Sequence, residues 1–269
     1  MKHDKVRRRD ESFTDKTATR IWEEVPSADN PYLAETCRLH GYDAFELLRK
    51  RSFIDVLYLL FRSELPTRNQ SKILESLMVG LINLGPRHSA TRASMSAGIG
   101  KTDPLHILPI GLLALTGNHM GAGEVESCMR FLKKHQRRDP GEVALEVLAK
   151  GRDTEEEDWH PVPGFGSRFG DVDITATRLA SSLLELPDAG ELLRWSGEFA
   201  ATLNQQSVGW LYPGVAAAVF ADLGFQPRSG GGLFQLLCAP GLLAHGVELA
   251  NKPFTAMPFV DDDHYIIEK

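Results

Sequence analysis

A glycine-rich turn around His119 holds the side chain in this sequence that is best suited to chemistry. The turn reads GNHMGAGE (117–124), and an amphipathic segment follows it. A histidine at the start of a helix lies close to backbone N–H groups, which favours the neutral imidazole. A neutral imidazole can donate a hydrogen bond to a carbonyl oxygen and stabilise negative charge that develops there. His119 is therefore the first candidate catalytic residue.

A basic cluster precedes this turn in the chain. Arg87, His88 and Arg92 follow the turn residues Gly85 and Pro86. On a helix that begins there, His88 and Arg92 are four residues apart and share one face. The cluster is either an anion site or a solvated helix start, and the residues alone leave both interpretations open.

A second glycine-containing turn, GFG at 164–166, is followed by Arg168. Its glycines allow a ligand to approach the backbone closely, and a fixed guanidinium beside them suits a phosphate or a carboxylate. The alternative is a connecting loop with a solvated arginine. The surrounding segment, 151–171, is acidic at first and then rich in proline and glycine, so we expect a domain boundary or an active-site loop there.

Other familiar chemical patterns are absent from the sequence. It contains no P-loop, HExxH or GxSxG pattern and no convincing set of metal ligands, so we predict no metal site. His106 and His245 lie among apolar residues and are expected to be core histidines. Cys128 falls on the apolar side of a helical pattern and is expected to be a core thiol.

The elements that must position these residues are helical almost throughout. Six apolar residues between Ile73 and Ile82 repeat at helical spacing and predict an amphipathic helix over 67–83. Similar patterns predict helices at 52–63, 140–150, 175–186, 190–204, 214–223 and 233–250. Only residues 17–42 mix short β-like runs with turn residues, which favours a small hairpin. We therefore predict an all-α fold with a minor N-terminal β-hairpin.

The composition limits the classes of function. The net charge of −6 argues against a nucleic-acid binder, which usually has a strong basic excess. Three scattered cysteines without a CxxC pair fit a reducing compartment. The longest apolar run, Ile107 to Leu115, contains Pro109 and is too short to cross a bilayer. With no apolar signal segment at the N-terminus, these features predict a cytoplasmic protein, with residues 1–16 as a disordered tail.

Four segments, taken in order, resemble those of a known family. LHGYDAFELL (39–48) runs into SFIDVLYLLFRSELPT (52–67); GNHMGAGE (117–124), PGFGSRFG (163–170) and MPFVDDDHYI (257–266) follow. Together they resemble the citrate synthase family, in particular its short citryl-CoA lyase-like branch. The resemblance covers about residues 17–269, and the opening segment is its most specific part.

This resemblance implies an all-helical fold with a large and a small domain, a homodimer and coenzyme A thioester chemistry. The large domain would comprise 17–151 and the C-terminal helix and tail at 226–269, and the small domain 152–225. Coenzyme A or an acyl-CoA would be the substrate, lying against Gly164, Phe165 and Gly166.

Carried over residue by residue, the family's thioester histidine falls on His119. Its second histidine falls on Ser167, whose hydroxyl can donate a hydrogen bond but cannot carry positive charge. Its catalytic aspartate should lie in 203–215, where no acidic residue occurs and Gln206 or Trp210 stands in its place. A further substrate histidine, expected near Asn83 or Leu84, is also missing, which leaves its role to His88 or Arg87.

Two main hypotheses follow. The first is an enzyme that acts on the coenzyme A thioester of a hydroxy polycarboxylate through a non-standard site. Its expected catalytic residues are His119, Ser167 and His88, its substrate-binding residues are Arg87, Arg92, Arg168 and Gln206, and its base is one of His88, Glu124, Asp171 and Asp173. The alternative is an inactive homologue that binds an acyl-CoA or a carboxylate and has a regulatory role. A purely structural partner of a true enzyme is a third, less favoured reading.

Overall fold

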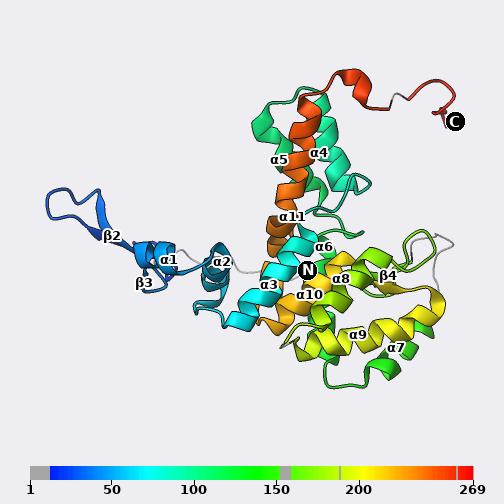
Figure 1. The fold of residues 1–269 in the computed structure, drawn as a ribbon, viewed down its shortest axis with the longest axis horizontal. Helices are drawn as coiled ribbons and strands as arrows, with labels where there is room; N and C mark the ends of the chain where they lie inside the picture. The colour runs from blue at the N-terminus through cyan, green and yellow to red at the C-terminus, as the bar shows by residue number, and fades with distance from the viewer. Residues whose placement is uncertain (1–12, 152–158, 188, 259, 269) are drawn as a thin grey trace, which may run out of the picture. The chain divides into compact units, whose positions relative to one another are not determined.

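The structure is a computed structural model that describes residues 13–151, 159–187, 189–258 and 260–268. Within these ranges it holds eleven α-helices, two short 3-10 helices and two small antiparallel sheets (Figure 1). The predicted all-α class with a minor hairpin is therefore confirmed. Most of the tail predicted at 1–16, and the acidic part of the 151–171 loop, lie outside the described residues.

The chain divides into two compact units between Pro66 and Thr67. No composition shift in the sequence pointed to this boundary, because the helix before it and the helix after it have similar amphipathic patterns. The division into a large domain (17–151 and 226–269) and a small domain (152–225) stays a prediction.

The first unit is a hairpin followed by two helices. Strand β1 (Trp22–Pro26) pairs antiparallel with β2 (Ala34–Leu39), which confirms the predicted hairpin, and β2 pairs with β3 (Tyr42–Asp43). Helices α1 (Ala44–Lys50) and α2 (Phe53–Arg62) follow. Ser52 begins α2 with a capping box, because its hydroxyl accepts from the N–H of Asp55 and the Asp55 carboxylate accepts from the N–H of Ser52.

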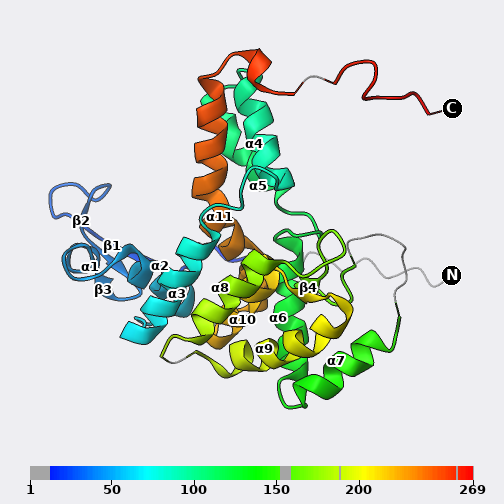
Figure 2. The same cartoon turned by 45° about the vertical axis from the view of Figure 1, so that its right-hand side comes forward.

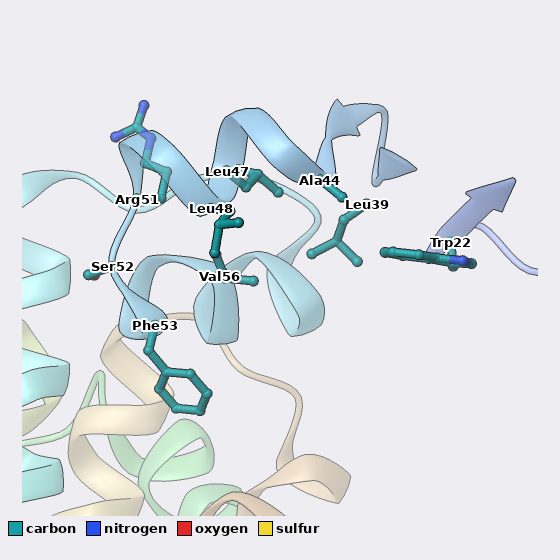
Figure 3. A pocket seen from close by; sticks show the side chains of 9 residues that line it. All are labelled: Trp22, Leu39, Ala44, Leu47, Leu48, Arg51, Ser52, Phe53 and Val56. Atoms are coloured by element: carbon teal, nitrogen blue, oxygen red, sulfur yellow. The ribbon is translucent and has the colours of Figure 1, made fainter. Parts of the chain in front are cut away.

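An apolar pocket of about 370 Å³ lies within this unit (Figure 3). Leu39 and Leu47 in its wall are buried and form a small core with Leu59. Among the described residues of the lining, Arg51 is the single ionisable side chain, so no acid–base pair lies there. The candidate catalytic residues all belong to the second unit. The pocket is lined by Trp22, Leu39, Ala44, Leu47, Leu48, Arg51, Ser52, Phe53 and Val56.

The second unit contains the remaining helices and the second sheet. The predicted helices of this unit are all present, and the last begins at Pro227 rather than at residue 233 because Gln226 and Pro227 form its N-cap and first turn. The elements are α3 (Arg68–Leu81), α4 (Ser89–Ile99), α5 (Pro104–Ala114), α6 (Gly123–His135), α7 (Pro140–Leu148), β4 (Phe165–Gly166), α8 (Ile174–Leu184), α9 (Glu191–Leu203), η1 (Asn204–Gln206), β5 (Gly209–Trp210), α10 (Tyr212–Asp222), α11 (Pro227–Ala250) and η2 (Phe254–Ala256).

Helix α10 forms the centre of this unit. Its residues from Pro213 to Ala221 are all buried, and it packs against α6, α9 and α11. A helix that is apolar all round is buried on every side, which explains why α10 shows no polar face. Its first turn therefore offers a fixed surface on which a neighbouring loop can rest.

Helix α11 runs alongside α4 and α5 (Figures 1 and 2). A side chain at Gly98 would place its Cβ 2.0 Å from the carbonyl oxygen of Gly246, so only glycine allows α4 and α11 to lie this close. Helix α11 is long and apolar enough to cross a membrane by length and composition alone, but it also packs against α6 and 44% of its most apolar window is buried. The core helix of a globular unit has the same composition.

Two histidine predictions are wrong and one cysteine prediction is confirmed. His106 on α5 is exposed, because α5 is apolar around its whole circumference and apolar neighbours do not identify its buried side. His245 is only half-buried, and its Nε2 lies 3.1 Å from Oδ1 of Asn83. Cys128 is fully buried, and its burial, with a smaller effect from the Glu124 carboxylate, raises the pKa of the thiol.

Candidate active site

The turn that carries His119 connects α5 to α6 and is held by its own backbone. The N–H of Ala122 donates to the carbonyl of Leu115 at 2.7 Å, and the N–H of Gly123 donates to that of Gly117 at 3.2 Å. Met120 adopts the left-handed region at φ 58°, which is uncommon for a residue with a side chain. His119 is exposed on this turn, just before the first residues of α6. The backbone that carries the imidazole is therefore well fixed.

His88 fastens this turn to helix α4. It is the N-cap of α4, where its Nδ1 accepts from the N–H of Ala90 at 3.2 Å and its Nε2 lies 3.1 Å from the carbonyl oxygen of Met120. Nε2 must carry the proton in that contact, so the pattern requires a neutral imidazole. Burial is the main cause that lowers the pKa of His88. The hydrogen bond to Met120 acts to raise this pKa, while the nearby charges of Arg168 and His119 lower it further.

The segment from Trp159 to Arg168 folds back on itself as a short hairpin. Pro163 and Gly164 form its tip, with Gly164 at φ 81°, and the N–H of Phe165 donates to Val162 at 3.1 Å. Proline followed by a glycine of positive φ is the pattern of a type II turn. At the open end, Ser167 N–H donates to the Trp159 carbonyl at 2.8 Å, and Trp159 N–H donates to Oγ of Ser167 at 2.9 Å.

The tip of this hairpin rests on the first turn of α10. A Cβ on Gly164 would lie 2.6 Å from Cα of Gly214, and the carbonyl of Gly164 accepts from the N–H of Leu211 at 3.1 Å. Phe165 is buried against the rings of Phe199 and Trp210. Gly164, Phe165 and Gly166 are all buried, and their contact with coenzyme A stays a prediction.

Glu124, in the first turn of α6, joins the two turns. Its Oε1 accepts from the N–H of Met120 at 2.6 Å, and its Oε2 accepts from the N–H of Gly164 at 2.8 Å. The residue is only 4% exposed. A carboxylate that accepts two backbone N–H groups is strongly held in place. Both of its oxygens are therefore used to hold the site together.

A histidine that the sequence analysis did not select lies at the centre of this arrangement. The ring of His160 stacks on the ring of His119, with the centroids 4.6 Å apart and the planes 19° apart. Its Nδ1 is 3.5 Å from Oε1 of Glu124. A signal was present in the sequence, because a chain that folds back about Pro163 and Gly164 places residue 160 opposite residues 166 and 167.

His88, His119 and His160 are called the imidazole cluster below, since His119 stacks on His160 and its charge acts on His88. Arg168, whose charge also acts on His88, borders a cleft of about 500 Å³. Its guanidinium lies 2.9 Å from Oδ2 of Asp173, so the residue is half-buried and ion-paired rather than freely solvated. Asp173 caps α8. Burial opposes its charge, but the hydrogen bonds from the Thr175 hydroxyl, the Ala176 N–H and Arg168 outweigh that effect and hold its pKa below the usual range. The cleft is lined by Leu84, Gly85, Pro86, Arg87, Arg168, Phe169, Val172, Asp173, Ile174 and Thr175.

The predicted site residues separate into two sets. His88 and His119 belong to the imidazole cluster, Ser167 holds the hairpin that carries His160, and Arg87 and Arg168 line the cleft. Arg92 on α4 and Gln206 in η1 are both exposed, and neither lines that cleft. Because α4 begins at Ser89, His88 is a cap residue and not a member of the helix face that carries Arg92.

Comparison with known proteins gave matches among solved structures alone. No family model matches the sequence, and no curated protein matches it. Citryl-CoA lyase from Hydrogenobacter thermophilus has a TM-score of 0.74 and 25% identity, with 94% of this chain and 95% of that chain covered.

Two further matches show the same fold. A mutant of ATP citrate lyase from Methanosaeta concilii, in complex with (3S)-citryl-CoA, has a TM-score of 0.70 and 19% identity; it covers 97% of this chain, which spans 43% of that longer protein. Citrate synthase from Thermoplasma acidophilum, in complex with carboxymethyl coenzyme A and oxaloacetate, has a TM-score of 0.59 and 14% identity, with 81% and 57% covered. The chain is thus a citryl-CoA lyase-like protein with the helical fold of the citrate synthase family.

Proposed function

We propose that this protein acts on the coenzyme A thioester of a hydroxy polycarboxylate such as citryl-CoA, and cleaves or forms the C–C bond between the α-carbon of the thioester and the β-carbon that carries the hydroxyl. The observation that carries the proposal is the exposed imidazole of His119 on its fixed turn, stacked on a second imidazole. It is supported by the fold, since one structural neighbour is a citryl-CoA lyase and another holds (3S)-citryl-CoA.

In the cleavage direction, the tertiary hydroxyl of the substrate loses its proton and its oxygen becomes a ketone. The C–C bond breaks, and its electron pair forms an enolate on the departing thioester. His119 donates a hydrogen bond to the enolate oxygen, where the negative charge develops. The enolate carbon then takes up one proton, which balances the proton lost from the hydroxyl, and the products are acetyl-CoA and the keto acid.

Two guanidinium groups, of Arg87 and Arg168, line the cleft beside the imidazole cluster. Guanidinium groups bind carboxylates and phosphates through two parallel hydrogen bonds. In the proposal, they bind the carboxylates of the polycarboxylate or a phosphate of coenzyme A. Asp173 already holds Arg168 in one orientation, which prepares that guanidinium for a planar anion.

An enzyme needs a base that accepts the proton of the substrate hydroxyl, whereas an inactive homologue does not. Among the four candidates, His88 has both ring nitrogens bonded to backbone groups and Glu124 has both oxygens so bonded. Asp173 is held by Arg168 and by the start of α8, while Asp171 is exposed. Three of the four candidate bases are thus already occupied by hydrogen bonds within the protein. This observation favours the alternative hypothesis, an inactive homologue that binds an acyl-CoA or a carboxylate and has a regulatory role.

The experiment that tests the proposal combines binding and turnover on the pure protein. We expect coenzyme A and acetyl-CoA to bind in a calorimetric titration, and citryl-CoA to be cleaved in an assay that couples the keto acid to a dehydrogenase. Binding without turnover would support the inactive homologue. If the titration gave no heat and the assay gave no turnover, both the enzyme and the inactive binding homologue would be contradicted.

We also propose that the protein is a homodimer. Helices α5 and α11 leave large apolar side chains exposed, among them Leu105, Leu113, Leu236 and Val247. Contiguous apolar patches usually mark an interface between protein chains, and we propose that these side chains form one. We expect light scattering to give twice the mass of one chain, and a clean monomer at micromolar concentration would contradict the proposal.

A cytoplasmic location is part of the proposal as well. The three cysteines, Cys37, Cys128 and Cys238, are all free thiols, which suits a reducing compartment. Recovery of the protein in a membrane or secreted fraction would contradict this location.

A further inference from the structure

We propose that His160 is a positioning residue, whose stacked ring fixes the imidazole of His119 in the orientation that the thioester oxygen requires. This inference rests on the proposed function, because it assigns His119 the contact with that oxygen. His160 would act through His119 rather than on the substrate itself.

The stack is the first observation. The two rings lie 4.6 Å apart at 19°, which is close to parallel. His119 is exposed on a turn, where a stacked neighbour narrows the set of rotamers that its side chain can adopt. His160, by contrast, has a side chain that is only 15% exposed. A half-buried ring under an exposed one restricts where the exposed ring can turn.

The second observation is that the hairpin is built to hold His160 there. Trp159, the residue before it, is tied to Ser167 by two hydrogen bonds, at 2.8 and 2.9 Å. Gly166 leaves the space that the ring fills, because a Cβ there would lie 2.6 Å from Cδ2 of His160 and 2.9 Å from the carbonyl oxygen of Trp159. Ser167, which falls at the position of the family's second histidine, thus holds in place the segment that carries His160.

The nitrogens of the ring indicate how it is held. Nδ1 faces Oε1 of Glu124 at the long distance of 3.5 Å, and Nε2 has no hydrogen-bond partner in the part of the chain that the structure describes. The ring of His160 is therefore held mainly by stacking on His119 and by close packing against Gly166, rather than by hydrogen bonds. An aromatic ring without nitrogens should position His119 nearly as well, which separates a positioning role from proton transfer.

The decisive comparison is between two substitutions of the same residue. We expect His160→Ala to lower kcat for citryl-CoA by about 10- to 100-fold, since a misplaced catalytic group typically costs about that much, with KM changed less than threefold. His160→Phe should stay within about fivefold of the wild-type kcat. A kcat for His160→Ala within twofold of wild type would overturn the proposal. So would an equal loss in both variants, which would mean that the imidazole itself transfers a proton.

A glycine pair supplies a matched control. Gly166→Ala should displace the ring and lower kcat about as much as His160→Ala, and the double variant should lose little more, because both changes remove one interaction. Gly232→Ala on α11 makes the same substitution where nothing lies within 4 Å, and it should leave kcat unchanged. Additive losses of Gly166→Ala and His160→Ala would contradict a shared cause.

A readout without turnover keeps this inference distinct from the proposed function. In the NMR spectrum of the free protein, the ring protons of His119 should carry the ring-current shift of a stacked neighbour. The shift should disappear in His160→Ala and persist in His160→Phe. If the wild-type protein cleaves no citryl-CoA but these shifts behave as expected, the proposed reaction fails and the stacked pair stands. Unchanged shifts in His160→Ala would overturn the pair itself.

Discussion

Replacement of His119 by alanine is expected to lower the rate of citryl-CoA cleavage by about 100- to 1000-fold, the usual cost of removing one hydrogen-bond donor from a developing oxyanion. The loss should appear in kcat and in kcat/KM alike, because the bond to the enolate forms only in the transition state. The fold should be unaffected, since the side chain is exposed and the turn is held by backbone bonds. Steady-state kinetics and a thermal melt test both parts.

A matched control for this variant lies on the preceding helix. His106→Ala also removes an exposed histidine, but from α5, away from the imidazole cluster. It should retain wild-type turnover. His119→Gln should fall between the two, because its amide can still donate a hydrogen bond. If His119→Ala keeps the turnover of the starting protein, the observed activity comes from a contaminant or from another site.

Glu124→Ala is expected to have the largest effect on stability. It leaves the buried N–H groups of Met120 and Gly164 without their acceptor. Hydrogen bonds to a charged group contribute about 1.5 to 3 kcal/mol each, so the free energy of unfolding should fall by about 3 to 6 kcal/mol. In a chain of this size that corresponds to a decrease in Tm of roughly 6 to 24 °C. Calorimetry or denaturant unfolding measures it.

The neighbouring Glu126 serves as the control for this prediction. It lies on the same first turn of α6 and forms an exposed ion pair with Arg130, four residues on. Such pairs contribute only about 0.3 to 0.5 kcal/mol, so Glu126→Ala should leave Tm almost unchanged. Equal effects of the two substitutions would show that Glu124 does not join the turns in solution.

The sequence predicted the helices and the turn of His119 because both depend on local patterns. The spacing of apolar residues between Ile73 and Ile82 determines which face of α3 is buried, and the fold around it supports that face. The glycines around His119 are required where the backbone bends most sharply: a Cβ on Gly121 would lie 2.4 Å from the carbonyl oxygen of Gly117. Signals of this kind need no knowledge of distant residues.

The pairs that complete the site could not be predicted in this way. Glu124 and Gly164 are 40 residues apart, and His88 and Met120 are 32 apart. Nothing in the neighbourhood of Glu124 in the sequence distinguishes a carboxylate that joins two turns from an ordinary acidic residue in the first turn of a helix. His160 was missed for a related reason, because its partner His119 lies on the far side of α6 and α7 in the chain.

The contact between Glu124 and Gly164 also bears on when this site comes into being as the chain folds. It closes a loop of 40 residues, and the entropy lost in closing a loop rises with its length. Helix α6 and the hairpin can each form early from local contacts, but the imidazoles meet only after that loop has closed. The amide of Gly164 is itself the donor in the closing bond. Its hydrogen-exchange rate therefore reports directly how often the assembled site opens.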